Sequence, residues 1–242
     1  MNPRVNQNFR KKIILGVASC VAICAMASFG FTARAQKREA SAMSDDKGKF
    51  VISVNGAPVG TEDFSISRAG SDWIARGTTE LHSGEETSRI TGELRLNGSV
   101  QPLQYMCSTG SGKKVTSTTT FVGTSAHIIL DLGEGKEPIR QDFTFASPVV
   151  VLDDNLYYQY EILAHAYDWK TGGAQTFAVF IPQEQAPGTI TAEAGAPVTV
   201  DGAKYEELTM RTPDLEVTLY LDAAHRLMRL VVPASKAEIR RQ

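Results

Sequence analysis

The sequence predicts a mainly β fold: a large curved antiparallel sheet, or an open or half barrel, with one amphipathic helix packed on it. From Phe50 to Val232, short β-rich segments alternate with turns rich in Gly, Asn and Pro. Apolar and polar side chains alternate with a period of two in several segments, as a sheet solvated on one face requires. Only residues 153–169 carry a helical period, and the short connections favour antiparallel neighbours.

The N-terminal residues have the pattern of an export signal. Residues 1–12 contain four basic and no acidic side chains, residues 13–31 are uncharged and mostly apolar, and Ala33 and Ala35 suit a signal-peptidase site. We therefore predict a signal peptide over residues 1–35.

Two alternatives concern the same N-terminal segment. The apolar run 13–31 is close to the length of a membrane-spanning anchor, and Val17-Ala18-Ser19-Cys20 loosely resembles a lipobox that would lipidate Cys20. All three interpretations place the folded part outside the cytoplasm, periplasmic or secreted.

Removing residues 1–35 leaves 207 residues and takes away five of the 25 Lys and Arg but none of the 27 Asp and Glu, so the net charge changes from −2 to −7. An acidic chain lacks the basic patch that nucleic-acid binding needs, which excludes that class of function. Cys107 is then the single cysteine, which excludes an intramolecular disulfide, and we expect it to be a buried, unreactive thiol.

Residues 36–47 are charged and without pattern, and we expect a flexible leader before one β-dominated domain over residues 48–242. A division into two domains at the helix is the alternative. Asn97-Gly98 is the strongest hairpin signal in the chain. The strands expected before the helix are Phe50–Val54, Val59–Arg68, Trp73–Leu81, Thr87–Leu96, Gln101–Thr109, Val115–Val122, Thr124–Leu132 and Ile139–Phe145.

The helix is predicted from spacing. Leu156, Tyr160, Leu163 and Tyr167 recur every three or four residues. We expect Asp153 or Asp154 to cap its first turn, and Thr171-Gly172-Gly173 to end it. The opposite face carries Tyr158, Gln159, Glu161, His165 and Asp168, which predicts a solvated surface with a local ion pair.

Five or six strands are expected after the helix, ended by Pro233, with residues 234–242 as a charged tail. A Pro- and Gly-rich segment over residues 182–188 interrupts them. These strands are Gln175–Ile181, Thr189–Glu193, Val198–Val200, Lys204–Arg211, Leu215–Leu221 and Leu227–Val232.

The sequence carries few signs of catalysis. The four histidines are scattered without ligand spacing, and no phosphate-binding glycine loop or nucleophile elbow is present, so we expect no metal, no cofactor and no catalytic residue. A hydrolase is the less favoured alternative. It would require two facing carboxylates, or Glu161 with His165, in one polar cleft.

A curved sheet with a helix over it can enclose an apolar cavity, and aromatic side chains are the usual lining of such a cavity. The same side chains also suit an ordinary core. The candidate ligand-binding residues are Trp73, Phe121, Tyr157, Tyr160, Tyr167 and Trp169.

The signal, the long strand-rich meander and the inserted helix together resemble uncharacterised exported bacterial β-rich proteins of unknown function. Their architecture is similar to that of LolA-type and mycobacterial lipoprotein carriers. The strand patterns Val59–Phe64, Leu219–Asp222 and Leu227–Pro233 carry this resemblance, which covers the chain after residue 35 in outline. It implies carriage or sensing of a lipid or acylated ligand in the cell envelope. Such carriers use several helices, whereas this chain shows one.

We therefore expect a non-catalytic envelope protein that binds an apolar or amphipathic, lipid-like ligand. The alternative is a structural or scaffolding module that binds an envelope protein through a sheet edge. The alternative predicts a filled core together with an exposed apolar patch or a long unprotected edge strand.

Overall fold

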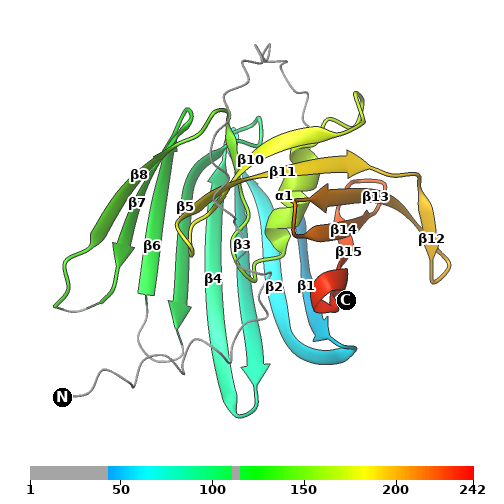
Figure 1. Ribbon diagram of the computed structural model, residues 1–242, viewed down its shortest axis with the longest axis horizontal. Helices are drawn as coiled ribbons and strands as arrows, with labels where there is room; N and C mark the ends of the chain where they lie inside the picture. Colours follow the sequence, from blue (N-terminus) through cyan, green and yellow to red (C-terminus); the bar gives the residue numbers. More distant parts are fainter. Residues whose placement is uncertain (1–42, 111–114, 134) are drawn as a thin grey trace.

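The computed structural model describes residues 43–110, 115–133 and 135–242, so the predicted signal peptide and most of the predicted leader lie outside the described residues. The described strands form one 16-stranded, strongly curved sheet whose path ends at β8 and β9, so it is open (Figure 1). Helix α1 lies inside the curve. This confirms the predicted fold class.

The strands before the helix follow the expected ones to within a few residues, with β9 in addition. The Asn97 hairpin is confirmed, because Asn97 Oδ1 accepts hydrogen bonds from Ser99 N at 2.9 Å and Gln101 N at 3.0 Å. The strands are β1 (Asp46–Val54), β2 (Ala57–Ala69), β3 (Asp72–Ser83), β4 (Glu86–Leu96), β5 (Pro102–Gly110), β6 (Val115–Val122), β7 (Ser125–Asp131), β8 (Ile139–Thr144) and β9 (Val149–Val151).

Seven strands follow the helix. The Pro- and Gly-rich segment is partly strand, because β11 already begins at Ala186. The strands are β10 (Gln175–Ile181), β11 (Ala186–Ala194), β12 (Val198–Val200), β13 (Ala203–Arg211), β14 (Glu216–Leu221), β15 (Leu227–Val232) and β16 (Ala237–Arg241), with a 3-10 turn η2 (Pro233–Ser235) before the last.

The prediction of a C-terminal tail was wrong. Pro233 begins η2, Lys236 turns the chain in a left-handed conformation, and β16 then pairs with both β15 and β1. Strand β16 therefore joins the strands before the helix to those after it in one sheet. The predicted leader also ends earlier than expected, because β1 starts at Asp46, which binds Arg241 of β16 at 2.5 and 2.7 Å.

Helix α1 spans Tyr158–Ala166, much shorter than the predicted residues 153–169. The expected solvated face is also wrong, because Tyr158, Gln159, Glu161 and His165 are all at most 1% exposed. The helix contacts β3 on one side and β15 on the other, so strands from before and after it in the chain both pack against it (Figure 1). Gly172 and Gly173 do not end it, because the backbone is already extended at Tyr167.

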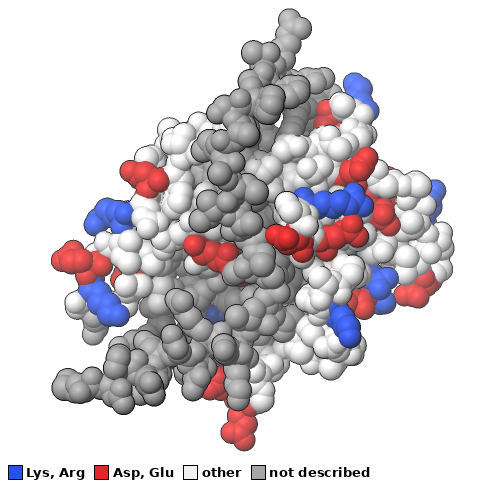
Figure 2. Space-filling model, in the orientation of Figure 1, with Lys and Arg blue, Asp and Glu red and all other residues white. Residues whose placement is uncertain are grey.

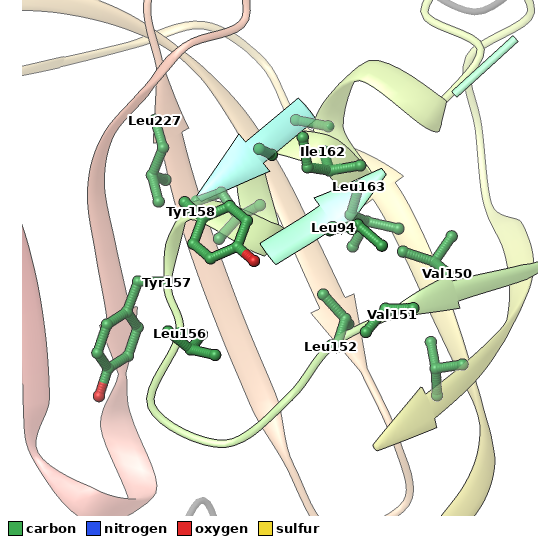
Figure 3. Close-up of a cluster of buried hydrophobic side chains, with 14 of the residues drawn as sticks. Leu94, Val150, Val151, Leu152, Leu156, Tyr157, Tyr158, Ile162, Leu163 and Leu227 are labelled. Carbon is green, nitrogen blue, oxygen red and sulfur yellow. The ribbon is translucent and has the colours of Figure 1, made fainter. Parts of the chain in front are cut away.

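The core fills the space between the helix and the concave side of the sheet. Ile90, Leu94 and Leu96 point inward, as the period-two alternation predicted, and Cys107 is 4% exposed, as expected. In Figure 3, side chains from α1 and the segment before it meet Leu94 of β4, Val150 and Val151 of β9, and Leu227 of β15. The helix is thus an internal plug.

No helix in the described part of the chain is long and apolar enough to cross a membrane.

Candidate functional site

The N-terminus of α1 is capped by a carboxylate from a distant strand. Glu62 of β2 is fully buried, and its Oε2 and Oε1 accept hydrogen bonds from Tyr157 N at 2.8 Å and Tyr158 N at 3.4 Å. Free N–H groups and the positive end of the helix dipole attract a carboxylate to this position. Burial nevertheless raises the pKa of Glu62 to about 8, while the two N–H donors oppose that shift. The predicted caps Asp153 and Asp154 were wrong.

Asp153 instead fixes the segment that leads into the helix. Its carboxylate accepts hydrogen bonds from the Tyr105 hydroxyl at 2.7 Å and from Gln183 N at 2.9 Å, and its N–H donates to Gln159 Oε1. Burial raises the pKa of Asp153, and its three partners come from β5, the turn after β10 and the helix. Through its carboxylate and its N–H, Asp153 therefore holds β5, the turn after β10 and the helix together.

The helix also carries a carboxylate that binds a strand, Glu161. Glu161 Oε2 accepts a hydrogen bond from Leu227 N, the first residue of β15, at 2.8 Å, and lies 3.9 Å from Arg241 Nη1. Burial raises the pKa of Glu161 to about 8. The helix is thereby attached to β2 at its start and to β15 in its middle, which fixes its position inside the sheet.

Two glycines on the concave face make room for the helix. A Cβ on Gly77 would lie 2.5 Å from both Glu62 Oε1 and Tyr158 Cδ1, and a Cβ on Gly92 would lie 2.6 Å from Leu156 Cδ1. Real Cβ atoms do not approach other atoms so closely. Strands β3 and β4 are therefore shaped for this helix in this position.

The side chains that the less favoured hydrolase alternative would require do not converge. Glu161 binds a backbone N–H of β15, and Asp168 closes a local turn by accepting hydrogen bonds from Lys170 N and Thr171. His165 is 1% exposed, and burial lowers its pKa to about 4, so the imidazole is neutral near pH 7. The described residues contain no group of three or more His, Cys, Asp or Glu side chains that could hold a metal ion.

The predicted ligand-binding aromatics fall into separate groups. Tyr157 stacks on the half-buried Tyr160, with ring centroids 6.5 Å apart. Tyr167 lies against Trp169, with ring centroids 5.0 Å apart, and its hydroxyl donates to Gly173 O and accepts from Ala194 N. These contacts are those of a packed core around the helix. Trp73 lies on β3 beneath Arg68, whose Cζ is 5.6 Å from the ring centroid.

Phe121 belongs to a different region, the concave side of β5–β8. Tyr105 points inward, because its hydroxyl reaches Asp153, and paired residues of antiparallel strands share a face. The same face therefore carries Thr119, Ile128 and Gln141, which follow Tyr105 across the register. Two residues further along in each direction, it carries Ser117, Phe121, Ala126, Leu130, Ile139 and Phe143.

We call this surface the open face and define it by Ser117, Thr119, Phe121, Ile128, Leu130, Ile139 and Phe143. Its exposure rises from β6 toward β8. Thr119 is fully buried, Ile128 is 2% exposed, Leu130 is half-buried, and Ile139 is 42% exposed. Helix α1 fills the other end of the concave surface, and Leu130 of β7 and Ile139 and Phe143 of β8 stay partly uncovered.

The deepest part of the open face contains an unsatisfied polar atom. Thr119 Oγ1 is buried and has no hydrogen-bond partner among the described residues. A buried hydroxyl without a partner costs roughly 1–3 kcal/mol, so such groups are rare and call for a reason. A bound ligand that supplies a polar atom is one such reason.

Of the residues of the open face, Phe121 alone was among those predicted from the sequence to bind a ligand. The 117–120 tract shows polar, β-branched residues, which identify a strand but not the side of it that faces a cavity. In β7 the run Ile128-Ile129-Leu130 is apolar on both faces, so its sequence does not show which side faces the helix.

No family model matches the chain, and no curated protein matches it. Among solved structures, the chain is similar to the beta-barrel-like protein of domain of unknown function DUF1849 from Brucella abortus, with a TM-score of 0.57 and 8% sequence identity. The match covers 84% of this chain and 97% of that chain. At this identity the likeness shows the fold alone, a β-barrel-like architecture. The similarity to LolA-type carriers stays a prediction.

Proposed function

We propose that the protein is an exported, non-catalytic envelope protein that binds an apolar or amphipathic, lipid-like molecule on the open face. The observation that carries the proposal is the uncovered apolar end of a concave surface whose other end is filled by a fixed helix. Concave, mostly apolar surfaces with a few polar groups are the usual composition of small-molecule sites.

The open face suits a ligand with an apolar body and one polar group. Leu130, Ile139 and Phe143 present partly exposed aliphatic and aromatic surface, and the buried Phe121 and Ile128 line its inner end. Burying a hydrocarbon chain against such surface contributes roughly 25 cal/mol per Å² of apolar area. At the buried end, the unpaired Thr119 hydroxyl can donate a hydrogen bond to a ligand oxygen or accept one from a ligand hydroxyl.

The core around α1 is a less suitable place for the ligand. Tyr167 is fully buried, and its hydroxyl already bonds two backbone groups. Moving the helix aside would expose Glu62 and Glu161 without their N–H partners and leave open the space that Gly77 and Gly92 provide for it. Of the six aromatics predicted from sequence, the proposal therefore retains Phe121.

The N-terminal signal pattern supports the cellular location in this proposal. An exported protein meets lipids and acylated molecules of the cell envelope, and a net charge of −7 after removal of residues 1–35 disfavours binding to anionic membrane surfaces. We therefore expect the protein to bind single ligand molecules in the open face and not to bind to the membrane surface itself.

The test compares Thr119→Val with Thr120→Val. Both substitutions replace a hydroxyl by a methyl group on β6, but Thr119 lies on the open face and Thr120 is exposed on the opposite, convex face. The full sequence is expressed in a bacterium, and the purified protein is analysed by native mass spectrometry and titrated with palmitate. We expect a lipid-sized adduct on the wild type and on Thr120→Val.

For Thr119→Val we expect binding to weaken by roughly tenfold while the free energy of unfolding rises by about 1 kcal/mol, because an unsatisfied buried hydroxyl is removed. Opposite effects on binding and stability distinguish a ligand contact from a structural one. An unliganded mass that never gains added palmitate, or equal affinities for all three proteins, contradicts the proposal.

A further inference from the structure

The surface of β5–β8 is unusual in this protein. The four exposed large hydrophobic side chains found in the described residues all lie in or beside these strands: Met106, Val122, Ile129 and Ile139. Met106, Val122 and Ile129 lie on the convex side, and Ile139 lies on the concave side. Exposed apolar side chains concentrated on one part of a protein mark an interaction surface.

Strand β8 is also the end of the sheet. It pairs with β7 on one side, and among the described residues no strand pairs with its other side. Five of its six residues are exposed. In Figure 2, basic and acidic side chains both gather along the left edge of the molecule, where β7 and β8 lie in Figure 1. An unpaired strand edge is a template for another strand.

We propose that β8 pairs antiparallel with β8 of a second copy of this chain, about a two-fold axis at Gln141. In this register, Arg140 lies opposite Asp142 of the partner copy, and the symmetry produces that pair twice. On the concave side, Ile139 lies opposite Phe143, and the two Gln141 side chains face each other. Each residue of Ile139–Phe143 thus meets a residue of matching chemistry.

The neighbouring symmetric registers are excluded by charge. With the two concave faces on the same side, shifting the axis by one residue toward the N-terminus places Arg140 opposite Arg140, and shifting it toward the C-terminus places Asp142 opposite Asp142. Like charges directly opposite each other destabilise a strand pair. The register centred on Gln141 is the one of the three that has opposite charges facing.

The pairing has a structural consequence that does not depend on the proposed ligand. It places Ile139 and Phe143 of both copies in one row on the concave side, so two open faces become continuous across the axis. The contact involves five residue pairs and is small compared with stable dimers. We therefore expect a weak dimer, with a dissociation constant on the order of micromolar.

The first test is charge exchange, measured by sedimentation velocity on the full chain. Arg140→Asp and Asp142→Arg each create two like-charge pairs and should raise the dimer dissociation constant at least about tenfold. The double variant Arg140→Asp/Asp142→Arg restores opposite charges and should return the constant to near its wild-type value. Melting temperatures of all variants control for changes in the monomer, because Asp142 also contacts His127.

The second test is a disulfide at the axis. Gln141→Cys places two thiols directly opposite each other, with Cα atoms about 4.5–5.5 Å apart, and should oxidise readily to a covalent dimer. Thr144→Cys is the matched control, because the two copies of residue 144 would be about 20 Å apart along the strands. Both variants keep the other cysteines of the chain.

A protein that stays monomeric up to about 100 μM overturns the proposal. So do equal dissociation constants for the wild type and the three charge variants, or equal cross-linking of Gln141→Cys and Thr144→Cys. Cross-linking of Gln141→Cys to a different polypeptide would assign the edge to another partner and reject self-pairing.

Discussion

Replacing Glu62 by Gln should make the stability of this protein less dependent on pH. Glu62 is fully buried between β2 and the start of α1, and burial raises its pKa to about 8. The side chain is therefore mainly protonated at pH 7, and Gln has the shape and neutrality of the protonated acid. In the Glu62→Gln variant, the side-chain amide carbonyl can still accept the hydrogen bond from Tyr157 N.

The expected magnitude follows from the two protonation states. An ordinary Glu has a pKa of 4.5, so between pH 4.5 and about 8 the native state binds a proton that the unfolded state releases. The free energy of unfolding then falls as pH rises, by up to about 1.4 kcal/mol per pH unit and about 5 kcal/mol over the whole window. The stabilising proton is fully bound below pH 4.5 and is lost as pH rises through 8.

The assay is urea unfolding followed by tryptophan fluorescence at pH values from 5 to 9. We expect Glu62→Gln to be close to the wild type at pH 5 and several kcal/mol more stable at pH 9. Asp63→Asn is the control, because Asp63 is the next residue along β2 and its side chain is 68% exposed. His165 affects both proteins equally: burial lowers its pKa from 6.5 to about 4, which reduces stability as pH falls through that range.

Equal losses of unfolding free energy between pH 5 and pH 9 for the wild type and Glu62→Gln would refute this reasoning. They would mean that Glu62 is ionised in the native state and that the two helix N–H groups outweigh its burial. Glu161, whose pKa is also about 8, gives the variant a remaining slope of the same sign.

Two further predictions test the fold. Removing residues 236–242 deletes β16, so we expect the truncated chain to lose the β-sheet circular dichroism signal or to become insoluble. A truncated chain with the melting temperature of the wild type would contradict the role of β16 in joining the two parts of the sheet. Gly77→Ala should reduce the free energy of unfolding by about 1–3 kcal/mol, because the added Cβ overlaps Glu62 and Tyr158. Gly188→Ala is the control, since a Cβ at that position would meet only a Val179 methyl group, at 3.2 Å. Equal losses of unfolding free energy for Gly77→Ala and Gly188→Ala would refute the overlap of the added Cβ with Glu62 and Tyr158.

The strands could be predicted from sequence because their signals are local. Alternation placed Ile90, Leu94 and Leu96 on the inner side of β4, and turn residues such as Asn97 marked where hairpins begin. Short connections also predicted an antiparallel meander, and the sheet path follows chain order from β8 back to β1. Each of these inferences needed only a few neighbouring residues.

The errors concern residues whose environment depends on distant parts of the chain. The AEIRR segment of β16 is short and charged, and it becomes a strand because β1 and β15 offer two edges and Asp46 binds Arg241. The polar face of α1 predicted exposure, yet Glu161 is buried, where its carboxylate accepts a hydrogen bond from Leu227 N. The open face was mostly missed for the same reason: which side of β6 and β7 stays uncovered depends on where the helix lies.

A fixed helix also determines how a ligand can reach the open face. Glu62, Asp153 and Glu161 attach α1 and the segment before it to four other parts of the chain, so opening the helix as a lid would leave several buried polar groups without partners at once. Each such group costs roughly 1–3 kcal/mol, which makes this motion unfavourable. Strands β8 and β9 are the two ends of the sheet path and do not pair with each other, and Ile139 of β8 is exposed. We therefore expect a ligand to enter at the β8 edge, and a Gln141→Cys disulfide between two copies to slow its exchange.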